Sequence, residues 1–409
     1  MDMVYKTGSF EGMKSLNQST ILNLVRLKGP ISRAEIAKIT KLTPPTVGGL
    51  VNELVEKNLI IEQEASKSNV GGRRPIMLSI NASAYFVIGV YAAAEVIRVV
   101  VATLDGKITF DYVQKITNLP TKSEFLAMVK ESIHYVLTEH EVDKKYILGL
   151  GVAMHGLVNP DKGLAIFSPH LQLRDIPLKD ELETEFNFPV MIENDVRALV
   201  IAESWFGQGQ GISDFLCISV GRGVGSGIFI NNEVYRSSFN TAGEIGHTIV
   251  DVNGPVCRCG NKGCLEACAS ETSILERAQE AIDSGKETIL AEWTSGDQSA
   301  LTIELVFKAA KEGDQLATSI LEVTGKSLGI ATANMINILK PSRIILEGQI
   351  FEGDDNIVVD SLQQMVNQYM LTNLSEDIKV ICSKLGKKGM VLGAVALIIN
   401  KVFMPGGVN

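Results

Sequence analysis

The sequence predicts an α/β protein in which a small helical module with a β-hairpin precedes a larger, two-lobed body. Residues 1–80 contain three helical patterns followed by two β-branched runs. From residue 81 onward strand and helix patterns alternate, and strand-rich starts near Phe86 and Phe215 indicate two related lobes. A chain of 409 residues is long enough for both parts. We therefore expect one domain over residues 1–80 and a second over residues 81–409.

Charge is distributed unevenly along the chain. Residues 1–80 contain 11 Lys and Arg against 7 Asp and Glu, whereas the whole chain contains 38 against 47. The rest of the chain therefore holds 27 basic and 40 acidic residues. A basic module on an acidic body is typical of a protein in which one domain meets phosphates. The N-terminus has no apolar signal segment, so we expect a cytoplasmic protein in a reducing compartment.

Periodicity and capping residues predict the elements of the N-terminal module. Apolar residues follow one helical face through "SLNQSTILNLVRL" (residues 15–27), and "GP" ends that helix. Ser32 with Glu35 three residues later is the capping-box pattern, which opens a second helix. Thr43 is a good N-cap for a third helix over residues 44–58. "LIIEQE" and "RPIMLSI" then predict a hairpin.

Two helices, a short turn, a third helix and a hairpin follow the order of a winged helix-turn-helix, whose third helix enters the major groove of DNA. Seven residues are the expected DNA contacts: Thr43, Thr46 and Asn52 at base edges, Ser32 and Arg33 near phosphates, and Arg73 and Arg74 in the minor groove. The alternative is an oligomerisation or lid domain. Gly48 and Gly49 weaken the third helix, which we interpret as close approach to DNA or to the second helix.

The body contains a series of buried strand patterns separated by helices. Residues 86–110 are typical of a hairpin that turns at Asp105-Gly106, and a helix follows over residues 123–139. Later patterns predict a strand over 147–158, a strand and helix over 188–205, a strand–glycine loop–strand unit over 214–231, and a helix running into a strand over 326–350.

A histidine and three cysteines are spaced for a metal site in "GHTIVDVNGPVCRCGNKGCLE" (residues 246–266). Zinc takes four nitrogen or sulfur ligands in a tetrahedron, and His247, Cys257, Cys259 and Cys264 supply one nitrogen and three sulfurs. A disulfide is disfavoured in a reducing compartment, and a catalytic thiol needs a partnered base. The sequence predicts a structural Zn²⁺ site over residues 247–264, with ordinary buried thiols as the alternative.

Three motifs give the chain a specific resemblance. "AGEIGH", "CRCGNKGCLE" and "ENDVRALVIAE" resemble the ROK family of repressors and sugar kinases, and the likeness extends over nearly the whole chain, including the "GGRRP" link of the repressor branch. It implies an actin/hexokinase-like ROK body after the winged helix-turn-helix. The residues implied to bind sugar are Asn194, Asp195, Glu244, His247 and Glu266, with Asp195 matching the general base of the kinases. The alternative is that Asn194 and Asp195 only cap a helix.

The phosphate-binding element of the family's kinases is altered in this chain. Those kinases carry D-x-G-G-T on the first strand of the body, whereas "GVYAAAE" here has Tyr91 in place of the aspartate and ends in Ala-Ala-Glu at residues 93–95. Side chains on this turn block close backbone approach to phosphates, and Glu95 repels them. We therefore expect no enzyme.

The leading hypothesis is a sugar-responsive transcriptional repressor of carbohydrate-utilisation genes, with xylose as the effector implied by the resemblance. It acts on operator DNA as a homodimer or higher homo-oligomer, because two half-sites need two N-terminal modules. The alternatives are a ROK-type sugar kinase with a regulatory N-terminal module, or a zinc-stabilised interaction protein without a small ligand.

Overall fold

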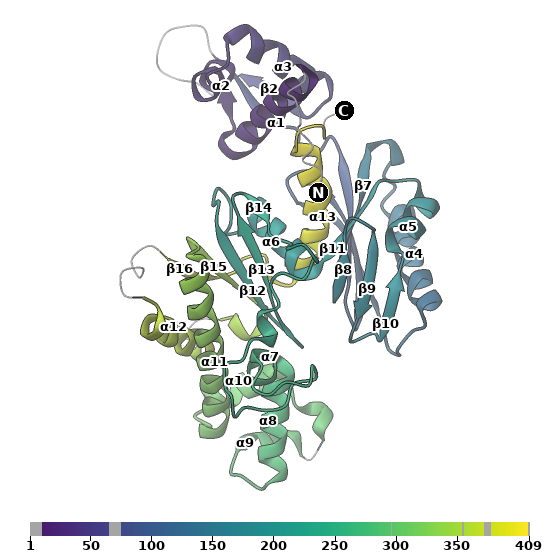
Figure 1. Cartoon of the computed structure of the whole chain (residues 1–409). Coiled ribbons are helices and arrows are strands. Elements are labelled where there is room, and N and C mark those ends of the chain that lie inside the picture. The colour runs from purple at the N-terminus through teal and green to yellow at the C-terminus, as the bar shows by residue number, and fades with distance from the viewer. Residues whose placement is uncertain (1–9, 65–74, 296, 354–355, 372–377, 408–409) are drawn as a thin grey trace. The chain divides into compact units, whose positions relative to one another are not determined.

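The computed structural model describes residues 10–64, 75–295, 297–353, 356–371 and 378–407 (Figure 1). The chain divides into two compact units, one formed by Met1–Ala198 with Val391–Asn409 and the other by Leu199–Met390. The chain passes from one unit to the other within two helices, α6 (Asp195–Phe206) and α13 (Gly389–Phe403). Within the described ranges, no helix is long and apolar enough to cross a membrane.

The N-terminal module has the elements expected from the sequence, with one addition. They are α1 (Phe10–Lys28), β1 (Ile31–Ser32), α2 (Arg33–Thr40), α3 (Pro44–Glu56), β2 (Ile60–Glu64) and β3 (Ile76–Ile80). The three strands form an antiparallel sheet in the order β1-β3-β2. Buried Ile21, Ile36, Val47 and Leu54 fill the space among the helices. The short strand β1 was not predicted, because two residues carry no periodic signal.

Both predicted caps of this module are present. The Ser32 hydroxyl accepts a hydrogen bond from the Glu35 backbone N–H, and the Ser32 backbone N–H donates to the Glu35 carboxylate at 3.0 Å. The Thr43 hydroxyl accepts from the Thr46 backbone N–H, and prolines occupy the first turn of α3. These local bonds satisfy backbone donors that a helix start leaves unpaired. The turn between α2 and α3 is therefore fixed by its own sequence.

The body of the first unit is built on a five-stranded sheet in the order β11-β7-β4-β5-β6. Its strands are β4 (Phe86–Ala92), β5 (Val96–Thr103), β6 (Ile108–Lys115), β7 (Ile147–Met154) and β11 (Val190–Asn194). The expected hairpin is in fact a three-stranded meander, because the chain also turns at residues 93–95, where the Ala93 N–H donates to the Val96 carbonyl. The small turn residues gave no turn signal.

Helices and a small sheet complete this body. Helices α4 (Lys122–Glu139) and α5 (Leu178–Phe186) pack on the five-stranded sheet, with Phe125, Val129 and Leu182 in its main apolar core. A separate sheet has the order β10-β9-β8 and contains β8 (Leu157–Asn159), β9 (Leu164–Ser168) and β10 (Leu173–Ile176).

The second unit repeats the strand topology of the first. Its sheet has the order β14-β13-β12-β15-β16 and contains β12 (Phe215–Val220), β13 (Val224–Ile230), β14 (Glu233–Val234), β15 (Arg343–Glu347) and β16 (Lys379–Cys382). In both sheets an antiparallel meander begins with a strand that also pairs in parallel with a later strand, and a further parallel strand follows. The prediction of two related lobes is confirmed at the level of topology.

Helices account for most of the rest of the second unit. They are α7 (Leu265–Ala269), α8 (Glu271–Asp283), α9 (Ile289–Thr294), α10 (Ile303–Lys311), α11 (Gln315–Leu339) and α12 (Ile357–Tyr369). The long helix α11 packs closely on α12, because a Cβ on Gly325 would lie 2.4 Å from the Val358 carbonyl oxygen. Ile344 and Leu346 of β15 lie in the same apolar core as Leu328 of α11.

Helix α13 lies directly on the backbone of the first unit's sheet. A Cβ on Gly151 of β7 would lie 1.8 Å from the Ala394 carbonyl oxygen, and one on Gly89 of β4 would lie 2.9 Å from the Val391 carbonyl oxygen. The C-terminal end of α13 contacts α1: the Phe403 carbonyl accepts from the Ser19 hydroxyl at 2.5 Å and from the Asn23 amide at 3.0 Å. The glycines of the sheet therefore allow α13 to join the body to the N-terminal module.

Replacing Gly151 by Ala should destabilise the protein, because the added methyl group cannot fit without moving α13 off the sheet. Overpacking of this kind costs about 1–3 kcal/mol. The matched control is Gly48→Ala, since no side chain of the described residues lies within 4 Å of the position its Cβ would take. That change should stabilise α3 by up to about 1 kcal/mol. Urea unfolding measures both, and equal stability of the two variants would contradict the close approach.

Candidate functional site

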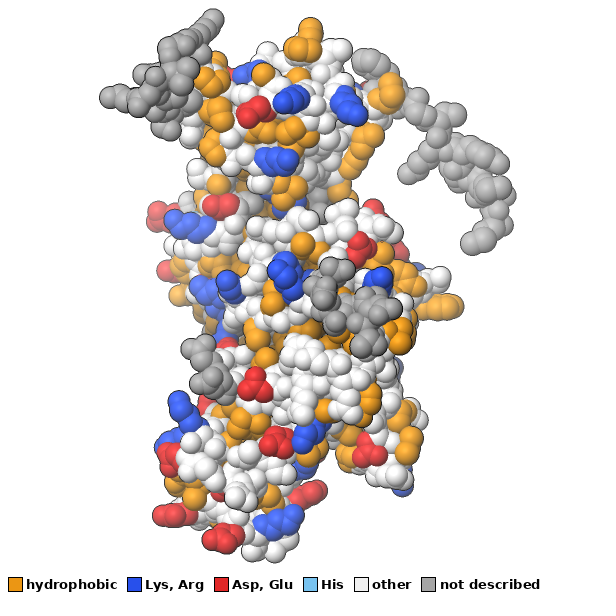
Figure 2. Space-filling view, turned by 90° about the vertical axis from the view of Figure 1, so that its left-hand side faces the viewer, with side chains coloured by type: hydrophobic (Ala, Val, Ile, Leu, Met, Phe, Trp, Pro, Cys, Tyr) orange, Lys and Arg blue, Asp and Glu red, His pale blue; other side chains and the backbone are white. Residues whose placement is uncertain are grey.

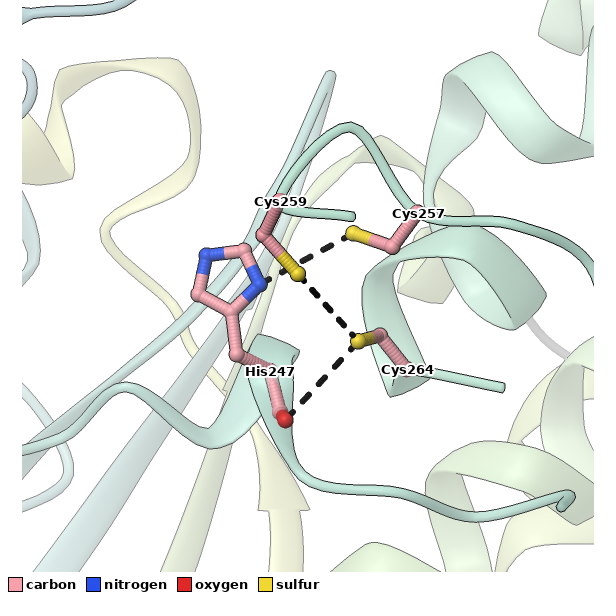
Figure 3. Close-up of side chains that lie close together, drawn as sticks. All are labelled: His247, Cys257, Cys259 and Cys264. Atoms are coloured by element: carbon pink, nitrogen blue, oxygen red, sulfur yellow. Dashed lines mark hydrogen bonds between the residues drawn. The ribbon is translucent and has the colours of Figure 1, made fainter. Parts of the chain in front are cut away.

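The predicted metal ligands converge in the second unit (Figure 3). The ligand atoms of His247, Cys257, Cys259 and Cys264 all lie within 4.8 Å of one another. Cys257 Sγ is 3.8 Å from His247 Nδ1, and Cys259 Sγ is 3.6 Å from Cys264 Sγ. A tetrahedral zinc ion with Zn–S bonds of about 2.3 Å places its sulfurs about 3.8 Å apart. These four residues therefore form a group that could hold a metal ion of this kind.

The backbone around the cluster is a tightly turned loop. The Cys257 N–H donates to the Asn261 carbonyl at 2.7 Å, and the Val250 N–H donates to the Gly263 carbonyl at 2.9 Å. Gly263 has φ +70°, and a Cβ there would lie 1.5 Å from the Asp251 carbonyl oxygen. Only glycine fits this position. The loop thus brings a 3-10 turn that ends at His247 next to the cysteines.

The three thiols differ in how readily they ionise. Burial raises the pKa of the Cys264 thiol to about 12 and also raises the pKa of Cys257. The backbone N–H of Asn261 lowers the pKa of Cys259 to about 7. Without a cation, the three thiols would not all be thiolates at neutral pH. A bound divalent ion deprotonates the thiols that coordinate it, so the donor set suits a site that releases protons on metal binding.

Glu266 and Glu244 lie on either side of the cluster in the sequence. Glu266 belongs to α7, which begins directly after Cys264, and its carboxylate accepts from the Val224 N–H at 3.2 Å. A Cβ on Gly223 would lie 2.6 Å from the same carboxylate, so the glycine loop leaves room for it. Glu244 stands at the N-cap of the 3-10 turn Ile245–His247 and is exposed. The second unit therefore holds Glu244, His247 and Glu266 close to one loop.

Asn194 and Asp195 lie in the first unit, where β11 meets α6. Asn194 Oδ1 accepts from the backbone N–H groups of Val196 and Arg197, both at 3.1 Å, and its amide donates to the Gly156 carbonyl and to Asp195 Oδ1. Asn194 therefore caps α6, as the alternative interpretation expects. Asp195 is buried, with Oδ1 bonded to Asn194 and Oδ2 facing His155.

A pair of histidines lies beside Asp195, and the contact of His155 with this carboxylate was not predicted from the sequence. His155 Nδ1 lies 3.5 Å from Asp195 Oδ2, and its ring stacks on the ring of His170 with 4.7 Å between centroids. His155 follows β7 and His170 lies between β9 and β10. A lone histidine after an apolar strand carries no signal, because only the tertiary fold brings it next to Asp195.

The junction that holds these residues contains a buried ion pair. The Arg197 guanidinium donates through Nε to Glu193 Oε1 at 2.8 Å, and both side chains are almost fully buried. The Asn194 backbone N–H also donates to this carboxylate. The pair therefore fixes the end of β11 to the first turn of α6. The pair thus joins the first and last residues of the "ENDVR" stretch.

The turn after β4 and a cavity of the second unit both lie near acidic side chains. Residues 93–95 form a tight turn between β4 and β5, with Tyr91 packed against Ala153 and Ala394. In the second unit, a cavity of about 610 Å³ is lined by residues that include Glu347, Glu352 and Lys387. Burial raises the pKa of Glu271, which starts α8 next to the glycine loop, and the nearby Glu304 raises it further.

The expected DNA contacts of α3 lie on its exposed face. Val47, Leu50, Val51 and Leu54 are buried, whereas Thr43, Thr46, Gly49 and Asn52 are exposed. Among the described residues, leaving out the adjacent residues and the helix's own backbone, no atom lies within 4 Å of a Cβ built on Gly48 or Gly49, so these positions do not closely approach α2. Ser32 caps α2 and Arg33 is its first residue. Arg73 and Arg74 lie outside the described residues.

The face drawn in Figure 2 shows no single basic patch among the described residues. On the face drawn in Figure 2, the Lys and Arg side chains of the described residues are scattered among apolar and uncharged ones rather than gathered into one extended patch.

Known proteins and protein families match both parts of this chain. A family model described as the ROK family matches residues 87–401, and one described as the MarR family matches residues 12–69. The chain is 31% identical over 395 residues to the xylose repressor of Caldicellulosiruptor bescii, covering 96% of this chain and 98% of the relative.

Two solved structures have the same fold. A ROK family transcriptional regulator homologous to the E. coli MLC protein matches with a TM-score of 0.84 and 28% identity, over 96% of this chain and 97% of that one. A ROK family glucokinase from Streptomyces griseus, in complex with glucose and AMPPNP, matches with a TM-score of 0.65 and 26% identity, over 76% of this chain and 98% of the kinase. The expected fold, a winged helix-turn-helix before a two-lobed ROK body, is confirmed, and the MarR match gives the type of the N-terminal module. The chain belongs to the ROK family.

Proposed function

We propose that the protein is a sugar-responsive transcriptional repressor, in which residues 1–80 bind operator DNA and residues 81–409 bind the sugar. The observation that carries this proposal is the likeness to a ROK regulator over 96% of the chain, N-terminal module included, whereas the glucokinase matches 76%. Because the exposed face of α3 is suited to one half-site, the protein acts as a homodimer or higher homo-oligomer.

A continuous set of contacts inside the first unit supports communication between sugar and DNA. Ala198 of α6, three residues after Asp195, packs with Ala394 of α13. The far end of α13 accepts hydrogen bonds from Ser19 and Asn23 of α1. α1 in turn contacts α3, since the Gln18 amide donates to the Glu53 carboxylate at 2.7 Å. A sugar that shifts the start of α6 can therefore act on α3 through packed helices.

Removing the link between α1 and α13 should weaken this communication. In the variant Ser19→Ala with Asn23→Ala, operator DNA is still bound, but the change in operator affinity caused by sugar falls by about threefold to tenfold, since both hydrogen bonds to the Phe403 carbonyl are lost. Thr20→Ala is the matched control, because that hydroxyl donates to the Leu16 carbonyl within α1. Fluorescence anisotropy of a labelled operator measures all three proteins, and an unchanged response in the double variant would exclude this route.

Sugar hydroxyls are bound by the residues that the family resemblance implies: Asn194, Asp195, Glu244, His247 and Glu266. Carboxylates and an amide suit this role, because they accept and donate hydrogen bonds to vicinal hydroxyls. Asp195 Oδ2 is supported most strongly, since the hydrogen bonds from Val196 and Asn194 use Oδ1 and leave Oδ2 beside His155. Xylose is the first sugar to test, because a relative over nearly the full length is named a xylose repressor.

Asp195→Asn should separate sugar binding from DNA binding. The amide keeps the shape of the carboxylate but cannot accept through both atoms, so operator binding is retained and its response to sugar falls at least tenfold. The operator is first obtained by selection from randomised DNA duplexes, and xylose, glucose and glucose 6-phosphate are then added. Asp180→Asn, an exposed carboxylate of α5, is the control. A full response from Asp195→Asn would refute the assignment.

The second candidate is a sugar kinase, favoured by Asp195 and by the likeness to the glucokinase. The loss of D-x-G-G-T at residues 91–95 and the acidic groups Glu271, Glu347 and Glu352 argue against it, because carboxylates repel the phosphates of ATP. We propose that the protein is not an enzyme. ADP release over the same sugars tests this, and turnover that Asp195→Asn abolishes would reinstate the kinase.

A structural Zn²⁺ ion is held by His247, Cys257, Cys259 and Cys264. Elemental analysis should find one zinc per chain in the wild type and essentially none in Cys259→Ser, with a lower melting temperature for the variant. Cys382→Ser, which changes a thiol outside the cluster, should keep its zinc. A wild-type protein purified without chelators that contains no zinc would contradict the assignment.

A further inference from the structure

One polar cluster on the N-terminal module joins three of its elements. Arg33, the first residue of α2, donates through Nη2 to Asn52 Oδ1 of α3 at 2.9 Å. Its other terminal nitrogen, Nη1, donates to the Glu62 carboxylate of β2 and forms an ion pair with it. Two of these residues, Arg33 and Asn52, were expected to contact DNA separately, near a phosphate and at a base edge. In the folded chain they contact each other.

The chemistry of Arg33 fixes which way the Asn52 amide points. A guanidinium has only donors, so the Asn52 atom that faces it is the carbonyl oxygen. The amide NH₂ group is then directed away from Arg33, on the exposed face of α3. In the major groove, such a donor finds acceptors at purine N7, guanine O6 or thymine O4. A side chain fixed in this way loses less conformational freedom on binding than a free one.

Glu62 changes what Arg33 offers to DNA. Its carboxylate neutralises the guanidinium, and both side chains are about one-third exposed, at 30% and 36%. A neutralised arginine releases no counterion from a phosphate, whereas a free one contributes about one unit to the salt dependence of binding. The pair therefore holds Arg33 on the protein rather than on the DNA backbone.

We propose that Arg33 is a positioning residue for base recognition: anchored by Glu62, it orients the Asn52 amide toward the major groove and makes no phosphate contact. This inference rests on the proposed DNA-binding function. It replaces the expectation that Arg33 lies near a phosphate. Glu62, on the wing strand β2, then influences base preference although Glu62 itself touches no base.

The test uses the full-length protein and a library of 30-base-pair duplexes with randomised positions. The charge-neutral double variant Arg33→Gln with Glu62→Gln removes the ion pair without changing net charge. At one base pair of each half-site, this variant should prefer the wild-type base about tenfold less strongly than the wild-type protein does. The Asn52→Ala variant should lose its base preference at the same base pair. On the duplex most enriched by the wild type, the slope of log affinity against log salt should stay unchanged.

The matched control removes an ion pair outside the N-terminal module, with Lys130→Gln and Glu181→Gln, whose charged atoms lie 2.7 Å apart. It should keep the wild-type base preference. A salt slope that falls by about one unit with base preference intact would make Arg33 a phosphate contact and overturn the inference. Loss of all binding in a double variant that melts like the wild type would also overturn it.

The result for the wild type distinguishes failure of the proposed function from failure of the inference alone. If the wild-type protein enriches no sequence from the library, the proposed function fails and the inference fails with it. If it enriches one and the Arg33→Gln, Glu62→Gln variant enriches the same sequence equally sharply, only the inference fails.

Discussion

The close approach of α13 to the sheet of the first unit is the constraint on which the rest depends. Gly151 lets the Ala394 carbonyl lie where a Cβ would otherwise stand. With its backbone against β7, α13 packs Ala394 on Ala198 of α6 and carries Phe403 to α1. Helix α13 therefore contacts α6, which begins with Asp195, and also contacts the N-terminal module, which contains α3. Interiors packed this closely transmit small displacements, because no free volume absorbs them.

Local hydrogen bonds and ion pairs fix the orientation of side chains on both proposed binding surfaces. Asn194 uses its carbonyl oxygen and its amide to cap α6 and hold Asp195, which leaves Asp195 Oδ2 beside His155. Arg33 and Glu62 act in the same way on Asn52. In the second unit, the glycine loop orients Glu266, and the Cys257–Cys264 loop needs Gly263 for its turn. In each case a neighbouring residue fixes the one proposed to bind.

The features that could be predicted from the sequence are those formed by residues close together in the chain. The capping box at Ser32, the Thr43 cap, the strand–glycine loop–strand unit and the four converging ligands of the cysteine loop could be predicted, because each depends on residues close in the chain. The pairing of Arg33 with Glu62 and the position of His155 beside Asp195 could not, because they join residues 29 and 40 positions apart. The turn at residues 93–95 was missed because it contains no glycine or proline.

The central claim is that sugar and operator DNA are linked through one protein, and thermodynamic linkage tests it most directly. Isothermal titration gives the affinity for the releasing sugar with and without saturating operator duplex, and anisotropy gives the affinity for operator with and without saturating sugar. The account predicts that both affinities change by the same factor, about 5- to 150-fold. A sugar that binds with the same affinity whether or not operator is present would contradict it.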